Sequence, residues 1–135
     1  MRCAPALLAC GLALGLSVGA FAQWGTGWDI PAGAEKEESP LAPTTDVLKR
    51  GKGVFERSCR KCHGPEGKGD GPDSDPRNPA ADLTDEQLIN DNPGGVMFYR
   101  VWNGRPRVMP AFKSQFTRDE VWAVVEHVKS LAKKP

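Results

Sequence analysis

The feature that most constrains the fold of this chain is the segment from Cys59 to Pro72, which reads CRKCHGPEGKGDGP. Two cysteines and a histidine lie within its first five residues, and the rest is glycine, proline and charged side chains. Glycine and proline favour turns, and no apolar side chain in the segment could anchor it to a hydrophobic core. Its shape must therefore be set by something other than burial of its own side chains.

The N-terminus has the pattern of a secretory signal peptide. Arg2 precedes a run of apolar and small residues, and Ala-Phe-Ala at positions 20–22 matches the small-x-small cleavage pattern. We expect residues 1–22 to be removed. A membrane anchor is the rival interpretation, but glycine and serine interrupt the apolar run and it ends on the cleavage pattern. The mature protein is then expected to be exported, soluble and periplasmic.

Removal of the signal peptide changes the cysteine count. Cys3 and Cys10 leave with it, so the mature chain keeps Cys59 and Cys62. In an oxidising compartment such a pair would normally form a disulfide. The charge of the full sequence is nearly balanced, with 18 Lys and Arg against 17 Asp and Glu. This balance argues against a nucleic-acid partner, which would need a strongly basic surface.

Residues 23–43 combine glycine, proline and a short acidic run without periodicity, which is typical of a flexible tether. Trp24 and Trp28 count against disorder, because large aromatic side chains are usually covered. We therefore interpret the segment as an N-terminal extension that lies against the domain.

Residues 44–135 show helical periodicity and no strand of any length, which predicts an all-α domain of several short helices. Capping signals mark the expected helix starts: Thr45-Asp46, Thr84 with Gln87, Asn92-Pro93, and Thr117 with Glu120. The first helix is expected to run through Cys62. Gly51 lies inside it at a cost of about 1 kcal/mol relative to alanine, so we expect another backbone to cross closely there.

The apolar residues are too sparse for these short helices to bury one another well, and small domains that lack a core often add a metal or cofactor. Cys59-x-x-Cys62-His63, the attachment motif, is the pattern for covalent attachment of haem c. Cysteines three residues apart on a helical turn can each bond one vinyl group of the porphyrin. The adjacent histidine then lies under the ring and ligates the iron.

Other chemistries for the same residues are less consistent with the sequence. A thioredoxin-like redox pair needs a βαβ setting, and no strand is expected. A structural zinc site needs four ligands, and His127 is the only other histidine. A disulfide would leave the missing core unexplained.

Met97 and Met109 are the candidates for a second axial ligand of the iron. Met97 falls in a helical apolar pattern, which favours a place in the core. Met109 lies between Pro106 and Pro110, and the residue before a proline is driven toward extended backbone. A stiff, extended loop is suited to presenting a thioether to a metal, so we predict Met109 as the ligand.

These residues resemble the class I c-type cytochromes, in particular the short bacterial periplasmic monohaem kind. The resemblance covers about residues 45–132. It rests on Gly51 and Phe55 four residues apart in the first helix, on the attachment motif, and on Met109-Pro110.

The resemblance implies the cytochrome c fold, with short helices packed around one covalently bound haem. It implies a C-terminal helix that crosses the first at near right angles with an aromatic residue at the contact, for which Trp122 is the candidate. It also implies that the Pro72 carbonyl accepts a hydrogen bond from His63. Trp102 or Tyr99 is expected near a haem propionate, and a core role for either is equally open.

The expected function is that of a periplasmic electron-transfer protein, a one-electron carrier with His63 and Met109 as axial ligands. With both axial positions filled by protein, catalysis is not expected. Two alternatives stay open: a haem enzyme or gas sensor with a dissociable Met109, and a haem domain of a larger oxidase or dehydrogenase complex. The expected partners are redox proteins that donate and accept electrons, such as a dehydrogenase or terminal oxidase of a respiratory chain.

Basic and acidic residues are distributed unevenly along the chain. The basic residues nearest the attachment motif and Met109 are Arg57, Arg60, Lys61, Arg105, Arg107 and Lys113. The acidic residues cluster at 35–38 and again at 70–86. A basic face around the haem edge, suited to an acidic partner, and a set of ordinary solvated charges are both consistent with this pattern.

Overall fold

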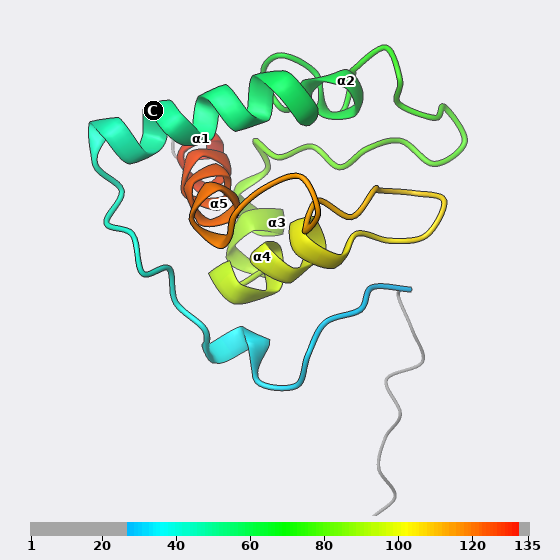
Figure 1. The fold of residues 1–135 in the computed structure, drawn as a ribbon. Coiled ribbons are helices and arrows are strands. Elements are labelled where there is room, and N and C mark those ends of the chain that lie inside the picture. The colour runs from blue at the N-terminus through cyan, green and yellow to red at the C-terminus, as the bar shows by residue number, and fades with distance from the viewer. Residues whose placement is uncertain (1–26, 133–135) are drawn as a thin grey trace, which may run out of the picture.

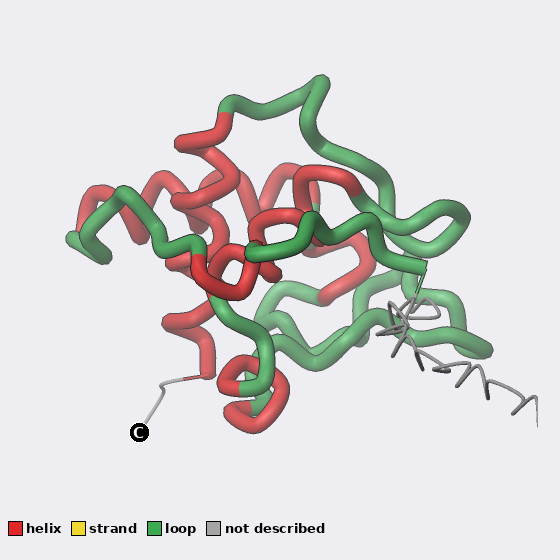
Figure 2. The backbone as a smooth tube through the Cα atoms, turned by 90° about the horizontal axis from the view of Figure 1, so that it is seen from below, coloured by secondary structure: helices red, strands yellow, loops and turns green. Residues whose placement is uncertain are grey.

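The computed structural model describes residues 27–132, and over this range the chain is helical without strands. The helices are η1 (Ala34–Lys36), α1 (Thr45–Ser58), α2 (Arg60–His63), α3 (Glu86–Asn90), α4 (Gly94–Asn103) and α5 (Arg118–Ala132). The all-α prediction is confirmed, and the loops between the helices are long (Figure 2). The expected signal peptide lies outside the described residues. Between residues 27 and 132, no helix has the length and apolar character needed to cross a membrane.

Side-chain caps start three of the helices, and two of them differ from the prediction. Thr44, not Thr45 or Asp46, caps α1, with its hydroxyl accepting from the Val47 amide at 3.3 Å. Asp85, not Thr84, caps α3 by accepting from the amides of residues 87 and 88. The capping box of α5 is confirmed, because the Thr117 amide donates to Glu120 at 2.9 Å and the Glu120 amide donates back at 3.3 Å.

Helices α1 and α5 cross at Gly51, as predicted from the cost of a glycine in that position. A Cβ atom at Gly51 would collide with the Ala123 carbonyl oxygen and would lie 2.8 Å from the Cβ atom of His127. In Figure 1, α1 lies across the view while α5 is seen end-on behind it. The absent side chain therefore sets how closely the two helices approach.

The core lies where α1, α4 and α5 meet. Its largest fully buried side chains are Phe55, Phe98, Val121, Val124 and Val125. The Trp122 ring stacks on Phe98 of α4 at 4.6 Å between centroids. The aromatic contact across the α1–α5 crossing is instead between Phe55 and His127, at 5.5 Å, so Trp122 does not have the place implied by the resemblance.

Residues 27–43 lie against the domain, and we call residues 27–37 the strap. In Figure 1 the strap, coloured blue to cyan, passes beneath α4. Ala34 is fully buried, and its carbonyl oxygen sits so close to Gly95 of α4 that a side chain there would not fit. Glu37 accepts a hydrogen bond from the Tyr99 hydroxyl at 3.0 Å and pairs with Arg118 at 3.8 Å. Residues 27–43 are thus a packed part of the fold.

Candidate functional site

The attachment motif forms a single tight turn at the end of α1. The regular helix breaks at Cys59, so the helix predicted to run through Cys62 is divided into α1 and α2. The amides of Cys62 and His63 both donate to the Cys59 carbonyl, at 3.2 and 2.9 Å. Both cysteines are half-buried free thiols. This turn therefore places two thiols and an imidazole on one short segment.

The glycine-rich segment after the motif is held by backbone hydrogen bonds to the motif itself. Gly69, Gly71 and Asp73 donate their amides to the carbonyls of His63, Cys62 and Lys61, at 2.8, 3.1 and 2.8 Å. Gly69 has a φ of 78°, in the left-handed region, and a Cβ atom there would collide with the Ala80 carbonyl. These bonds explain how a segment without apolar anchors takes one shape.

The imidazole of His63 is oriented by Ala81 and not by Pro72. Its Nδ1 atom lies 3.1 Å from the Ala81 carbonyl oxygen, so Nδ1–H donates and Nε2 is left free for a metal. The Pro72 assignment was wrong because the backbone on either side of Pro72 is bonded to α2. The chain then runs out through residues 74–79 and returns, which brings Ala81 to the ring.

Burial changes the acid–base properties of the motif. Burial, with a smaller contribution from Cys62, raises the pKa of the Cys59 thiol to about 12. A thiol with so high a pKa is not the reactive thiolate of a disulfide oxidoreductase. Burial lowers the pKa of His63, partly offset by its bond to Ala81, which favours the neutral imidazole needed for metal ligation.

Met109 closes a tight turn that begins at Arg105. The Arg105 amide donates to the Met109 carbonyl at 2.8 Å, and the Met109 amide donates to the Arg105 carbonyl at 2.9 Å. Arg107, at the tip, has a φ of 62° in the left-handed region. Met109 is half-buried and lines a cavity of about 420 Å³ together with the other residues of the turn. Met97, by contrast, is buried in the core, in agreement with the expectation for it.

The turn that carries Met109 and the glycine-rich segment project from the same side of the crossed helices (Figure 1). Both thus extend beyond the α1–α5 core, and each is held by backbone hydrogen bonds. No metal site of the zinc type competes for this region, because residues 27–132 contain no group of three or more His, Cys, Asp and Glu suited to a metal. His127 packs edge-on against Phe55 instead.

Arg100 on α4 is a functional candidate that the sequence interpretation missed. Its Nε atom is buried and has no hydrogen-bond partner among residues 27–132. Its guanidinium lies 5.3 Å from the centre of the Trp28 ring, and burial lowers its pKa. A half-buried guanidinium with an unpaired, buried Nε atom keeps its charge and is most stable beside an anion. The carboxylates of a haem would supply one, so this residue and the attachment motif both fit the cofactor.

Tyr99 and Trp102 have other partners in the structure. The Tyr99 hydroxyl donates its single proton to Glu37, so the phenol is not free for a haem propionate. Trp102 stacks on Phe98 at 5.5 Å and lies under the Arg118 guanidinium. The placement of Trp102 near a haem propionate stays a prediction.

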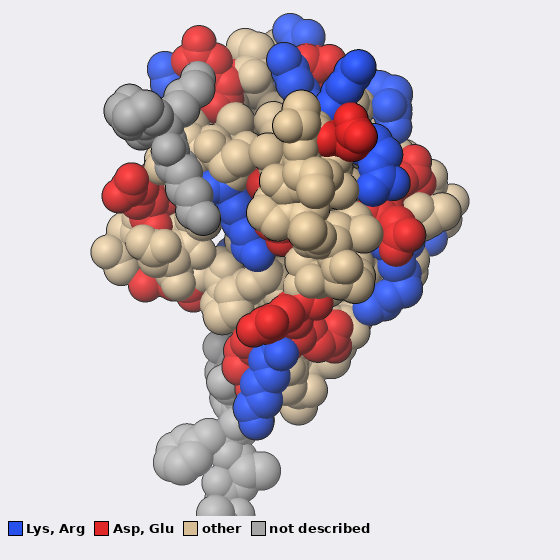
Figure 3. Space-filling model, turned by 90° about the vertical axis from the view of Figure 1, so that its left-hand side faces the viewer, with Lys and Arg blue, Asp and Glu red and all other residues tan. Residues whose placement is uncertain are grey.

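A second hollow lies away from the attachment motif, between the strap and α5. It has a volume of about 540 Å³, and its walls include Glu35, Glu38 and the ion pair of Glu126 with Lys129. In Figure 3, which views the molecule from the left of Figure 1, acidic and basic side chains alternate around a largely uncharged centre. No residue of the motif or of the Met109 turn lines this hollow.

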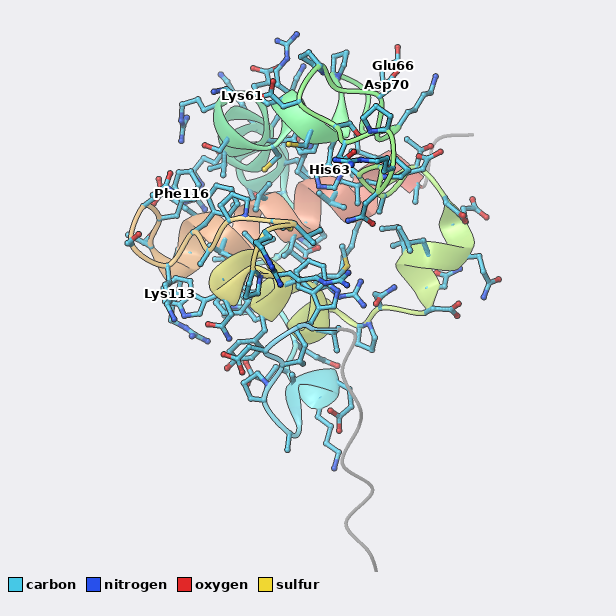
Figure 4. All side chains as sticks on the ribbon, turned by 90° about the vertical axis from the view of Figure 1, so that its right-hand side faces the viewer. Lys61, His63, Glu66, Asp70, Lys113 and Phe116 are labelled. Atoms are coloured by element: carbon cyan, nitrogen blue, oxygen red, sulfur yellow. The ribbon has the colours of Figure 1, made fainter. Side chains whose placement is uncertain are left out.

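Charges of opposite sign lie on different sides of His63 (Figure 4). Lys61 and Lys113, from two separate segments, project on one side, and Glu66 and Asp70 project on the other. Lys61 and Lys113 are both exposed. Lys68 pairs with Glu66 at 2.7 Å, so the acidic side also carries a cation.

The chain is similar to known proteins both in sequence and in fold. The model of the Cytochrome c family matches residues 48–132. A chain of the Kuenenia stuttgartiensis reducing HAO-like protein complex Kustc0457/Kustc0458 is similar with a TM-score of 0.59 and 33% identity, over 70% of this chain and 47% of that one. The KustC0563 c-type cytochrome has a TM-score of 0.51 and 24% identity, over 62% of this chain and 98% of its own. No curated protein matches this sequence.

Proposed function

The chain belongs to the cytochrome c family, and from this we propose that it is a periplasmic one-electron carrier and not an enzyme in its own right. Proteins of this family carry haem c covalently, and the iron of the haem takes up and releases one electron. Cys59 and Cys62 are consistent with that attachment. The observation that supports the proposal best is the tight turn that holds two thiols beside an imidazole with its Nδ1 already engaged.

Two side chains of this chain would ligate the iron. His63 offers its Nε2 atom, because the Ala81 carbonyl holds the other ring nitrogen and fixes the tautomer. Met109 offers a soft thioether from a turn closed by two backbone hydrogen bonds. If these two side chains hold the iron, no position would be left for a substrate, and this favours a carrier over a catalyst.

Arg100 would hold a carboxylate of the haem. Its buried Nε atom lacks a partner among residues 27–132, and the ion pairs formed within that range do not include it. Trp28 covers one side of the guanidinium. A charge-assisted bond to a carboxylate would satisfy the buried group.

The partners would be redox proteins that donate and accept single electrons, such as a dehydrogenase or a terminal oxidase of a respiratory chain. Similarity to one chain of the reducing HAO-like protein complex supports a redox partner, although this chain spans about half the length of that one. The signal-peptide pattern of residues 1–22 supports export to the periplasm.

Absorption spectra of the purified protein test the proposal. We expect the ferrous spectrum to be unchanged by carbon monoxide, since His63 and Met109 would occupy both axial positions. A spectrum shifted by carbon monoxide would instead favour a haem enzyme or a gas sensor with a dissociable Met109.

A further inference from the structure

The strap contacts the residues that lead into the Met109 turn at three points. The Asn103 side chain donates to the Asp29 carbonyl at 2.8 Å. The Arg105 guanidinium lies 5.9 Å from the centre of the Trp28 ring. The side chain of Arg105 also lies against Gly27, where an added Cβ atom would come within 3.1 Å of Arg105 Nε.

Arg105 connects these contacts to Met109. Its amide and carbonyl are the two groups that pair with the backbone of Met109, at 2.8 and 2.9 Å. The turn between them places Arg107 in the left-handed region, which a residue with a side chain rarely adopts. This conformation costs energy although backbone hydrogen bonds close the turn, so contacts from outside the turn add to its stability.

The Trp28 indole contributes to the support of the turn because its ring contacts two arginines. Arg100, on the rigid helix α4, lies 5.3 Å from the ring centre, and Arg105, on the turn, lies 5.9 Å from it. One aromatic ring thus links the turn to a helix through two cation–π contacts. The rest of the strap is fixed separately, by the burial of Ala34 and by the contacts of Glu37.

We propose that the strap braces the Met109 turn, and that Trp28 and Arg105 are positioning residues that keep the Met109 thioether directed at the iron. This inference rests on the proposed function, because it assumes that Met109 is the second axial ligand. In this protein the N-terminal extension is then part of the redox site. Loss of the brace increases the fraction of molecules in which Met109 is detached.

The holoprotein with Trp28→Ala tests the brace. Hydrogen exchange at the amides of Arg105 and Met109 is expected to become about tenfold faster, which corresponds to about 1.4 kcal/mol in the opening of the turn. The far-red sulfur-to-iron band of the ferric protein is expected to be lost at a lower temperature, and the ferrous protein is expected to bind carbon monoxide. Trp28→Phe, which keeps an aromatic face, is expected to behave like the wild type.

Two further variants keep the test decisive. Glu37→Gln loosens the other end of the strap and is expected to lower the melting temperature without changing exchange at Met109. If Trp28→Ala yields no folded holoprotein, Asn103→Ala removes the bond to Asp29 and is expected to change exchange and the band in the same direction. Wild-type exchange and a wild-type far-red band in folded Trp28→Ala or Asn103→Ala would refute the brace. It would also be refuted if Glu37→Gln changed exchange at Met109 and the band as much as these variants do.

Met109→Ala, measured in the same series, separates the two hypotheses. A far-red band that survives in Met109→Ala would refute the ligand assignment, and this inference with it. A band that is lost there but unchanged in Trp28→Ala and Asn103→Ala would refute the brace alone.

Discussion

At the scale of single residues, the soft sulfur of Met109 is expected to set the redox properties. We predict that Met109→Ala abolishes the far-red band and lowers the reduction potential, because a thioether ligand stabilises ferrous iron. Visible spectroscopy and potentiometry measure the two effects. Met97→Ala is the control, since Met97 is buried in the core. A band lost in Met97→Ala would show that the ligand was assigned to the wrong methionine.

Arg100 is expected to act on the potential through its charge. Removing a half-buried cation that would lie beside the haem carboxylates would stabilise ferric over ferrous iron, so we predict that Arg100→Gln lowers the reduction potential. Arg100→Lys, which keeps the positive charge, is expected to have a reduction potential close to that of the wild type. Arg50→Gln removes an exposed arginine of α1 and is the matched control. An equal fall in potential in Arg50→Gln would mean that net charge alone is responsible.

At the scale of the elements, two glycines of α1 lie in contrasting surroundings. A Cβ atom at Gly51 collides with the Ala123 backbone, whereas at Gly53 it meets the flexible end of Arg57 at 3.4 Å. We predict that Gly51→Ala lowers the free energy of unfolding by about 1–3 kcal/mol, as overpacking does. Gly53→Ala is expected to raise it by up to about 1 kcal/mol, because alanine has the higher helix propensity. Denaturant unfolding of the two holoproteins measures both, and equal effects would contradict a tight crossing.

At the scale of the whole molecule, folding is expected to depend on the covalent haem. The described core is built from parts of α1, α4 and α5, while long loops make up much of the rest (Figure 2). We predict that Cys59→Ser with Cys62→Ser gives a mostly unfolded chain, because small domains short of core need a further stabilising element. Circular dichroism during heating measures this. A cooperative unfolding transition without haem would contradict the prediction.

Charge on the surface around His63 is expected to steer a partner. Arg105 is partly buried against Trp28, so the exposed Lys61 and Lys113 are better probes of a basic face. We predict that electron transfer with an acidic partner slows as salt rises, because charges more than about 8–10 Å apart are screened at physiological ionic strength. Stopped-flow kinetics measures this.

Variants separate steering from the alternatives. Lys61→Glu with Lys113→Glu is expected to slow association with an unchanged haem spectrum, while Lys36→Glu on the strap is not. An electron-transfer rate that changes neither with salt nor with the Lys61 and Lys113 substitutions would indicate an apolar docking surface. Val108, the exposed large hydrophobic side chain among the described residues, would then be the candidate contact.

Interactions between neighbours in the sequence determined what could be predicted without the structure. The helix class and the Thr117–Glu120 capping box depend on residues three or four apart, and both are found as expected. The close helix crossing at Gly51 could also be predicted, because glycine destabilises the interior of a helix and its presence there indicates a compensating contact.

Only the tertiary structure decided which residues distant in the sequence meet. Ala81, and not Pro72, orients His63. The amides of Gly71 and Asp73, on either side of Pro72, donate to carbonyls of α2, and the chain then returns to bring the Ala81 carbonyl to the imidazole. Arg100 and Trp28 are far apart in sequence and meet because the strap crosses beneath α4. Such contacts depend on the path that long loops take over the folded surface. Hydrophobic periodicity and capping signals predict helices, and they do not predict the path of a loop.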